Sequence, residues 1–295
     1  MSEKERILNI AKNLDIHLNK DQGQCILIDT NIADYIIEQA NLDPKNDTVL
    51  EIGPGFGILT ERMVGSTKKT IAIEQDDRLC EYLNDRFGDR KPFTLICDDA
   101  LKIELPECNK VVSNLPYQIS GPILERFILM DPFPQQLILM LQHEFIERLV
   151  SKPDPKTYSR LSALGQTYFK IKYLRKIPPH HFFPQPRVRS GIVKLTINPE
   201  LPKYLKPIHM RSLYIEFLAG IFPYKNKKLK NAVVYFVENI DKTPDNWSED
   251  CKYVFGSKKN RISMITQIFS KQQNKDRLRE FTASELAELF QLLLE

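Results

Sequence analysis

Residues 48–57 read Thr-Val-Leu-Glu-Ile-Gly-Pro-Gly-Phe-Gly, and this stretch decides the fold class. The first five residues predict a short buried strand, the alternate glycines predict a tight turn, and the apolar pattern from Ile58 onward predicts a helix. A glycine-rich turn between a strand and a helix lets a ligand approach the backbone beside the helix amino terminus. The spacing is GxGxG and not the GxGxxG of dinucleotide-binding folds, so a tight turn without a ligand is the alternative.

Two further strands downstream also end in acidic residues. Residues 70–74 predict a strand that ends in Glu74, about 20 residues after the first glycine, where a carboxylate can accept both hydroxyls of a ribose. Residues 93–97 predict the next strand, which runs into Asp98-Asp99-Ala100. This acidic pair can accept a hydrogen bond from the exocyclic amine of an adenine, or it can belong to a loop with a helix cap.

The stretch 111–117, Val-Val-Ser-Asn-Leu-Pro-Tyr, predicts a buried strand that stops at Asn114. Such a strand presents an amide and a phenol ring at its carboxyl end, the edge at which open α/β sheets bind ligands. The alternative is an ordinary exit from a strand, with Asn and Pro as turn residues.

Strands alternate with helices as far as Ile197, which predicts an α/β fold with a doubly wound, mostly parallel, seven-stranded Rossmann-like sheet. The last strands lie close together in sequence without a full helix between them, so we expect antiparallel pairing at one edge. Near residue 200 several prolines mark a linker, and the pattern becomes helical over residues 213–222, 229–237, 261–270 and 284–294. We therefore expect a domain over residues 1–200 and a small all-α domain over residues 201–295.

Composition narrows the class of protein further. The five cysteines are odd in number and show no CxxC spacing, which predicts reduced thiols and neither a disulfide framework nor a metal site. The amino terminus is charged and no apolar run approaches about 18 residues, so we expect a cytoplasmic protein without a membrane segment. Residues 148–190 hold ten basic residues and one acid, a balance that attracts phosphate backbones or forms a solvated basic face.

Taken together and in this order, the motifs resemble those of the ribosomal RNA small-subunit adenine dimethyltransferases, the dimethyladenosine transferase family, in its archaeal-type branch. The segments that carry the resemblance are residues 23–27 (GQCIL), 51–55 (EIGPG), Glu74, Asp99-Ala100, 114–117 (NLPY), 158–162 (YSRLS), 182–188 (FFPQPRV) and 217–232. The last of these is similar to part of the family's helical carboxyl-terminal domain.

The resemblance implies S-adenosylmethionine as the cofactor. The residues implied to bind it are Gln24, Cys25, Leu27, Gly53, Gly55, Glu74, Asp99, Ala100 and Asn114. Glu74 would hold the ribose hydroxyls and Asp99 the adenine amine. Two positions depart from the family pattern: Ile26 stands where Phe is usual, and Cys25 where many members have Asn or His. We expect Cys25 to act through its backbone, because a thiol contributes little polar binding.

The implied catalytic residues are Asn114, Leu115, Pro116, Tyr117 and Phe182. An adenine amine is a poor nucleophile because its lone pair is delocalised into the ring. The Asn114 side chain and the Leu115 carbonyl can accept the amine protons and turn the lone pair toward the methyl group. Tyr117 and Phe182 would stack on opposite faces of the base, although a core position between prolines is the alternative for Phe182.

The activity that the resemblance implies is N6,N6-dimethylation of two adjacent adenines in a 3′-terminal hairpin of small-subunit rRNA, with a role in assembling that subunit. The expected partner is this rRNA within a pre-30S-like particle, bound by a monomer. The candidate RNA-binding residues are Arg148, Arg160, Arg187, Lys225, Lys227 and Lys228. The alternatives are a non-catalytic rRNA-binding assembly factor and a large-subunit rRNA adenine N6-methyltransferase.

Overall fold

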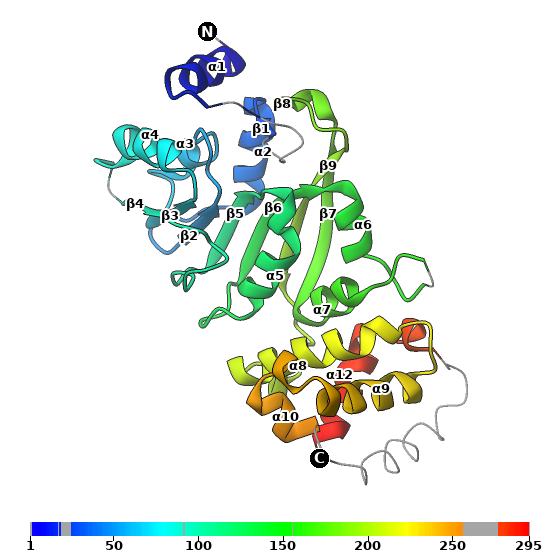
Figure 1. The fold of residues 1–295 in the computed structure, drawn as a ribbon. Helices are drawn as coiled ribbons and strands as arrows, with labels where there is room; N and C mark the ends of the chain where they lie inside the picture. Colours follow the sequence, from blue (N-terminus) through cyan, green and yellow to red (C-terminus); the bar gives the residue numbers. More distant parts are fainter. Residues whose placement is uncertain are drawn as a thin grey trace. The chain divides into compact units, whose positions relative to one another are not determined.

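The computed structural model describes residues 2–16, 18, 25–90, 92–154, 156–255 and 277–294. They form two compact units, of which the first comprises residues 1–146 and 171–197 and the second residues 147–170 and 198–295 (Figure 1). Gln24 and the predicted helix over residues 261–270 lie outside the described residues.

The first unit is built on a seven-stranded sheet with the strand order β4-β3-β2-β5-β6-β9-β7. The strands are β2 (Thr48–Ile52), β3 (Lys69–Glu74), β4 (Phe93–Cys97), β5 (Lys110–Asn114), β6 (Gln136–Gln142), β7 (Phe169–Ile177) and β9 (Ser190–Ile197). Strands β4, β3, β2, β5 and β6 pair in parallel, whereas β9 pairs antiparallel with β6, and β7 lies beyond it at the edge. The predicted fold class and the antiparallel pairing near one edge are confirmed.

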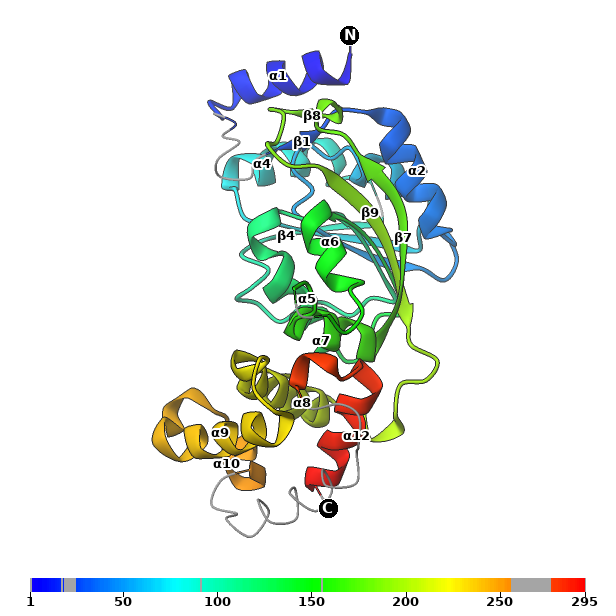
Figure 2. The same ribbon diagram turned by 90° about the vertical axis from the view of Figure 1, so that its right-hand side faces the viewer.

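Helices cover both faces of this sheet. They are α2 (Thr30–Ala40), α3 (Thr60–Met63), α4 (Asp77–Phe87), α5 (Ser120–Ile128) and α6 (His143–Leu149). Figure 2 shows α2 on the opposite side of the sheet from α5 and α6. The apolar stripe of α2, which includes Ile32 and Ile36, packs against Val49, Val112 and Ile138 of the central strands. This packing buries the strands on both faces, which is why their sequences are almost continuously apolar.

Helix α2 begins one residue earlier than the sequence pattern indicates. The apolar stripe that includes Ile32 and Ile36 predicts a helix over residues 31–41 with Thr30 as its N-cap. Asp29 holds that position instead and accepts hydrogen bonds from the backbone N–H groups of Asn31 (2.9 Å) and Ile32 (3.2 Å). The same carboxylate lies 2.7 Å from Nδ1 of His181, a residue distant in sequence. This contact with His181 favours Asp29 over Thr30 as the N-cap. It cannot be predicted from the local sequence, because His181 lies 152 residues away.

A short two-stranded sheet lies beside the large one. Strand β1 (Ile26–Leu27) pairs antiparallel with β8 (Phe182–Phe183), and Leu27 faces Phe182 in the register. Helix α1 (Glu3–Asn13) packs nearby, with Ile7 and Ala11 in one apolar cluster with Phe56 of the glycine-rich turn. The amino-terminal helix is therefore part of the first unit and covers the turn.

The described part of the second unit is helical and is built around aromatic side chains. Its helices are α7 (Arg160–Tyr168), α8 (Ile208–Ile221), α9 (Leu229–Lys242), α10 (Glu249–Phe255) and α12 (Ala283–Leu294). The ring of Phe217 lies between 5.4 and 5.9 Å, centroid to centroid, from those of Phe236, Phe255 and Phe290.

The division into units differs from the expected domains 1–200 and 201–295 in two respects. The second unit begins at residue 198 after the sheet, and it also includes residues 147–170, which contain α7. The reason is that α7 packs against α8 and α12, with the ring of Tyr168 edge-on to Tyr214 at 6.2 Å. The chain thus enters the helical unit, returns to the sheet through β7 and β9, and enters the helical unit again.

The expectation of five reduced thiols is wrong for one pair. Cys80 of α4 and Cys97 at the end of β4 form a disulfide, with their Cα atoms 6.0 Å apart. The two residues meet because α4 packs against β3 and β4. Cys25, Cys108 and Cys251 are buried thiols. Within the described part of the chain, none of the helices is both long enough and apolar enough to cross a bilayer.

The turn after β2 requires a glycine at position 57. Gly57 has φ +79°, and a Cβ atom there would lie 2.7 Å from Cε2 of the buried Phe87 ring. Gly65 also has a positive φ (+91°), but among the described residues no atom beyond its two chain neighbours lies within 4 Å of the corresponding position. We expect Gly57→Ala to lower the free energy of unfolding more than Gly65→Ala. In both variants the left-handed backbone lowers the free energy of unfolding by about 1–2 kcal/mol. In Gly57→Ala the overpacking against Phe87 lowers it by about 1–3 kcal/mol more.

Urea denaturation of the two variants measures the difference. Equal losses of stability would show that the Phe87 ring moves aside at little cost, and would contradict this account of the turn.

Candidate active site

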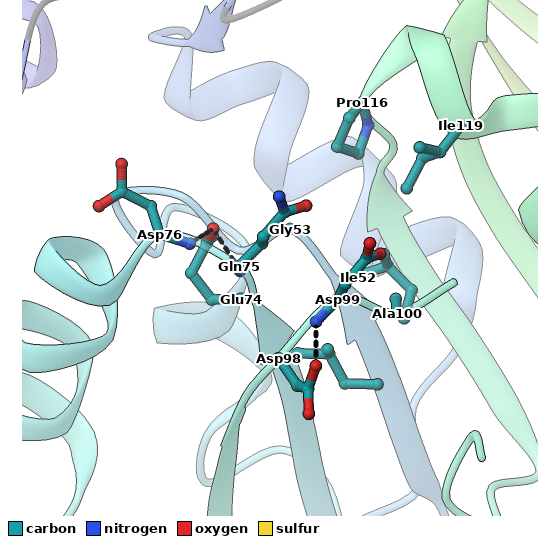
Figure 3. Close-up of a pocket in the computed structure, with 11 residues that line it drawn as sticks. Ile52, Gly53, Glu74, Gln75, Asp76, Asp98, Asp99, Ala100, Pro116 and Ile119 are labelled. Atoms are coloured by element: carbon teal, nitrogen blue, oxygen red, sulfur yellow. Dashed lines mark hydrogen bonds between the residues drawn. The ribbon is translucent and has the colours of Figure 1, made fainter. Parts of the chain in front are cut away.

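Two adjoining cavities lie at the carboxyl ends of the central strands. The first, of about 440 Å³, is lined by Ile52, Gly53, Ile73, Glu74, Gln75, Asp76, Asp98, Asp99, Ala100, Pro116 and Ile119 (Figure 3). The second, of about 160 Å³, is lined by Ile16, Leu18, Cys25, Ile26, Gly53, Gly55, Phe56, Glu74, Asp76, Leu79, Asn114, Leu115, Pro116, Tyr117 and Gln118. Gly53, Glu74, Asp76 and Pro116 belong to both, so a single elongated ligand can occupy the two cavities together.

The glycine-rich turn brings the ends of β2 and β5 into contact. Gly53 has φ +67°, and a Cβ atom at this position would lie 3.2 Å from the ring of Pro116. Its backbone N–H donates to the carbonyl of Ile73 at the end of β3 (2.9 Å). Gly53 therefore joins three strand ends at the point where the two cavities meet, as the predicted role of the turn requires.

Glu74 stands at the centre of the site. Its carboxylate accepts backbone hydrogen bonds from Gly55 (3.1 Å), Gln75 (2.8 Å) and Asp76 (3.1 Å), the last two of which are drawn in Figure 3. The side chain is only 8% exposed, and burial raises the pKa of Glu74 although these three hydrogen bonds favour the charged form. Glu74 thus fixes the turn and at the same time presents carboxylate oxygens to both cavities.

The first cavity has an acidic wall formed by the end of β4. The backbone N–H of Asp98 donates to the carbonyl of Glu74 (2.9 Å), which fastens the β4 end to the β3 end. Asp99 is held by the backbone N–H of Leu101 (2.9 Å) and, on its other oxygen, by the Lys102 ammonium at 3.4 Å. The predicted cofactor residues Gly53, Glu74, Asp99 and Ala100 therefore line one cavity together.

The second cavity is bordered by the stretch that leaves β5. The backbone of this stretch is fixed because Ser113 donates its hydroxyl to the carbonyl of Ile52 (2.6 Å) and the N–H of Leu115 donates to the carbonyl of Met140 (3.2 Å). Asn114, Leu115, Pro116 and Tyr117 all line this cavity, so the structure brings four of the five predicted catalytic residues together.

Phe182 is the predicted catalytic residue that the structure places elsewhere. Its ring is 1% exposed, lies in the apolar core with Leu27 and Ile138, and borders neither cavity. The pairing of β8 with β1 is the cause, because alternation along a strand turns Phe182 inward and Phe183 outward. In this structure Phe182 is therefore a core aromatic and not the second wall of a base-binding site.

Of the predicted cofactor-binding residues near the amino terminus, one lines a cavity and another is buried in the core. Cys25 lines the second cavity, whereas Leu27, only 1% exposed, belongs to the core. The sequence did not single out Ile16, Leu18 and Phe56, which also line the second cavity. The signal for Phe56 was its place between two glycines of the turn, but no local pattern indicated that the segment after α1 reaches the site.

The candidate RNA-binding residues fall in different parts of the chain. Arg148 and Arg160 belong to the second unit and Arg187 to the first. Lys225, Lys227 and Lys228 form the turn before α9, where the Lys225 ammonium donates to the carbonyl of Tyr158 (3.2 Å) and Lys227 and Lys228 are exposed.

The structure adds two arginines to this turn that the sequence did not indicate. Lys228 forms a β-bridge with Arg277, and the guanidinium groups of Arg277 and Arg279 both donate to Asn226, at 2.7 and 2.8 Å. The five basic residues Lys225, Lys227, Lys228, Arg277 and Arg279 are called the basic cluster below.

Glu51 lies beneath the turn and carries a buried carboxyl group. It is 2% exposed and accepts a hydrogen bond from the Thr60 hydroxyl (2.6 Å). Burial, and to a lesser extent the nearby charge of Glu74, raise the pKa of Glu51 to about 8. The group is therefore largely uncharged at neutral pH in the folded protein, whereas in the unfolded chain it ionises near its ordinary value of 4.5.

This difference predicts a pH-dependent loss of stability. Between about pH 4.5 and 8 the folded state holds a proton on Glu51 that the unfolded state has released, so rising pH favours unfolding. We expect Glu51→Gln, which removes the ionisation, to gain stability relative to the unaltered chain by about 1.4 kcal/mol per pH unit in this window. Denaturation at several pH values measures the gain, with pH 5 as the reference. A difference that stays constant from pH 5 to 8 would contradict the buried neutral carboxyl.

Several known proteins are similar to this chain in sequence. A family model described as ribosomal RNA adenine dimethylase matches residues 16–246. A Methanosarcina acetivorans protein named probable ribosomal RNA small subunit methyltransferase A is 41% identical over 224 residues, which cover 75% of this chain and 80% of that protein. A protein of the same name from Methanococcus maripaludis is 37% identical over 233 residues, covering 78% and 86%.

Two solved structures are also similar. A dimethyladenosine transferase from Plasmodium falciparum has a TM-score of 0.72 at 25% identity and covers 90% of this chain and 95% of its own. The 23S rRNA methyltransferase ErmE has a TM-score of 0.61 at 21% identity and covers 92% and 100%, a likeness that concerns the fold alone.

Proposed function

The chain belongs to the ribosomal RNA adenine dimethylase family, and from this premise we propose that it dimethylates N6 of two adjacent adenines in small-subunit rRNA with S-adenosylmethionine. The observation that carries the proposal is the junction of the two cavities. An acidic cavity that suits a nucleoside opens into a second cavity bordered by Asn114 and Tyr117 through the shared residues Gly53 and Pro116.

The residues present fit S-adenosylmethionine. Glu74 offers carboxylate oxygens for ribose hydroxyls, and Asp99 offers one for an adenine amine. The turn at Gly53 and Gly55 gives a ligand access to the backbone. The cofactor supplies an electrophilic methyl group on a sulfonium, whose positive charge is favoured by the acidic side chains that line the site.

The residues after β5 would bind the target adenine and orient its amine. The Asn114 side-chain oxygen and the Leu115 carbonyl can accept hydrogen bonds from the two amine protons. This takes the nitrogen lone pair out of conjugation with the ring and directs it toward the methyl group. The Tyr117 ring offers a face for stacking, which contributes about 1–3 kcal/mol per base. A strong base is unnecessary because the amine proton becomes acidic as the carbon–nitrogen bond forms, so the rate gain comes mainly from positioning.

A neutral acceptor at position 114 also supports a second transfer. A monomethylated amine carries one proton, and an uncharged amide can accept it without requiring a second one. We propose dimethyladenine as the product for this reason.

The second unit is proposed to bind the RNA through the basic cluster, which gathers five cations around one turn. We propose that the substrate is rRNA in an assembling small subunit and that the chain acts in the cytoplasm. Among the described residues, those that line the two cavities belong to the first unit. We propose that the enzyme acts as a monomer.

Cofactor binding gives the first test. We expect Glu74→Gln to weaken S-adenosylmethionine binding about 10- to 100-fold, because a carboxylate acceptor contributes more than a neutral one. Isothermal titration calorimetry measures the dissociation constant. Glu38→Gln, which changes an exposed carboxyl group of α2 in the same way, is the matched control. An unchanged affinity in Glu74→Gln would contradict the assignment of the first cavity to the nucleoside.

Methyl transfer to small subunits tests the proposed function directly. With excess labelled cofactor and undermethylated small subunits, we expect dimethyladenine at two adjacent positions when the modified bases are mapped. Asn114→Ala should lower the rate by about 100-fold or more, as loss of one preorganised polar group in an active site does. Asn46→Ala is the control, because Asn46 lies just before the amino-terminal end of β2, at the end of the strand opposite the candidate site.

Three outcomes would contradict the proposal. Exclusive monomethyladenine would exclude the second transfer, and methylation of isolated large subunits alone would identify the other substrate class. Normal subunit binding without methylation by the unaltered chain would favour a non-catalytic assembly factor.

A further inference from the structure

One hydrogen bond joins two motifs that lie far apart in the sequence. The phenol oxygen of Tyr117, in the stretch after β5, lies 2.5 Å from the hydroxyl oxygen of Ser190, 73 residues later. Ser190 follows directly on the stretch 182–189 and is fully buried, whereas Tyr117 is half-buried and lines the second cavity. Both residues belong to the first unit. The bond therefore connects a side chain of the candidate site to the frame of the sheet.

Ser190 is itself held firmly from both sides. It is the first residue of β9 and pairs with Gln142 at the carboxyl end of β6. The carbonyl of Arg189 accepts a hydrogen bond from the backbone N–H of His143 (2.8 Å). On the other side, a Cβ atom at Gly191 would lie 2.7 Å from the phenol oxygen of Tyr173, so the strand is packed without spare room.

The packing beneath Gly191 is also fixed. The phenol oxygen of Tyr173 lies 2.9 Å from Nδ1 of His143, the first residue of α6. The backbone that carries the Ser190 hydroxyl group is therefore rigidly held.

Tyr117 has a backbone fixed at one end and a ring that needs a second support. The backbone is set by the preceding Leu115, whose N–H donates to Met140, and by Pro116. The side chain retains two rotatable bonds, and the contact at its para oxygen fixes the far end of the ring. Burial raises the pKa of Tyr117 to about 12, so the phenol keeps its proton at neutral pH and the hydrogen bond persists.

We propose that Ser190 is a positioning residue for methyl transfer: it holds the Tyr117 ring in the plane in which the ring stacks on the target adenine. The inference rests on the proposed function and assigns a role to a residue that touches neither cavity. It also explains how the 182–190 segment acts on the site in this structure. Phe182 is buried in the core, and the link to the Asn114–Tyr117 stretch runs through the hydroxyl group at the end of the segment.

A double-mutant cycle tests the proposal. Ser190→Ala and Tyr117→Phe each remove one partner of the bond, and the double variant removes both. We expect each single variant to lower the single-turnover rate of methyl transfer about 3- to 10-fold, the range that follows from losing one net hydrogen bond. The double variant should be no slower than the slower single variant, because both act through one interaction.

Two further measurements separate positioning from a general structural effect. The dissociation constant for S-adenosylmethionine should stay unchanged in all three variants. An RNA hairpin with 2-aminopurine at the target position should show weaker fluorescence quenching on binding to Ser190→Ala than to the unaltered chain, because the ring stacks less well. Ser190→Thr, which keeps the hydroxyl, should restore both rate and quenching.

Thr70→Val is the matched control. Thr70 and Thr67 also form a buried hydroxyl–hydroxyl hydrogen bond (2.7 Å), but at the beginning of β3, away from the site. This variant should match the stability loss of Ser190→Ala and leave transfer and quenching unchanged. If the losses of the two single variants add in the double variant, or if Thr70→Val lowers the rate equally, the role of Ser190 is overturned. Absence of transfer by the unaltered chain would instead overturn the proposed function and this inference with it.

Discussion

The close approach of Gly53 to Pro116 is the contact on which the site depends. A Cβ atom at Gly53 would lie 3.2 Å from the proline ring, and the positive φ of the glycine turns the chain between the ends of β2 and β5. These two residues line both cavities, so they set the distance between the first cavity and Asn114. The central strands are buried on both faces and cannot shift independently, which makes the junction as rigid as the core below it.

Three carboxyl groups, those of Glu51, Glu74 and Asp99, lie at or beneath the first cavity, and burying or crowding negative charge destabilises a fold. Glu51 avoids the cost by staying protonated, since burial raises its pKa to about 8. Glu74 is compensated by three backbone N–H groups, and Asp99 by a backbone N–H and the Lys102 ammonium. The cavity therefore keeps a negative electrostatic potential. This potential attracts a cationic ligand, whose hydroxyl and amine groups can donate hydrogen bonds to the carboxylates, and repels a ligand rich in phosphate.

The sequence predicted those cavity-lining residues whose position follows from strand ends. Glu74 and Asn114 each end a parallel strand, and Asp99 lies two residues beyond the end of another. Parallel strands place their carboxyl ends on the same side of the sheet. Features that depend on distant packing were missed or wrong. Asp29 replaced Thr30 as the cap because of His181, Phe182 was turned inward by its pairing with β1, and Cys80 met Cys97 through α4. No local pattern contains these partners.

The basic stretch 148–190 shows why a charge count alone is a weak guide to RNA binding. Part of it is β7, an edge strand whose exposed residues include Lys170, Lys172, Arg175 and Lys176. Positive charge on an exposed edge prevents pairing with other chains, which explains these residues without any ligand. The basic cluster has no such explanation, because its exposed lysines lie in the turn before α9, where two arginines distant in sequence bind Asn226. Folding brings these charges together from two segments of the helical unit that lie 51 to 53 residues apart in the sequence. That convergence is a stronger argument for a phosphate-binding surface than the longer basic run in the sequence.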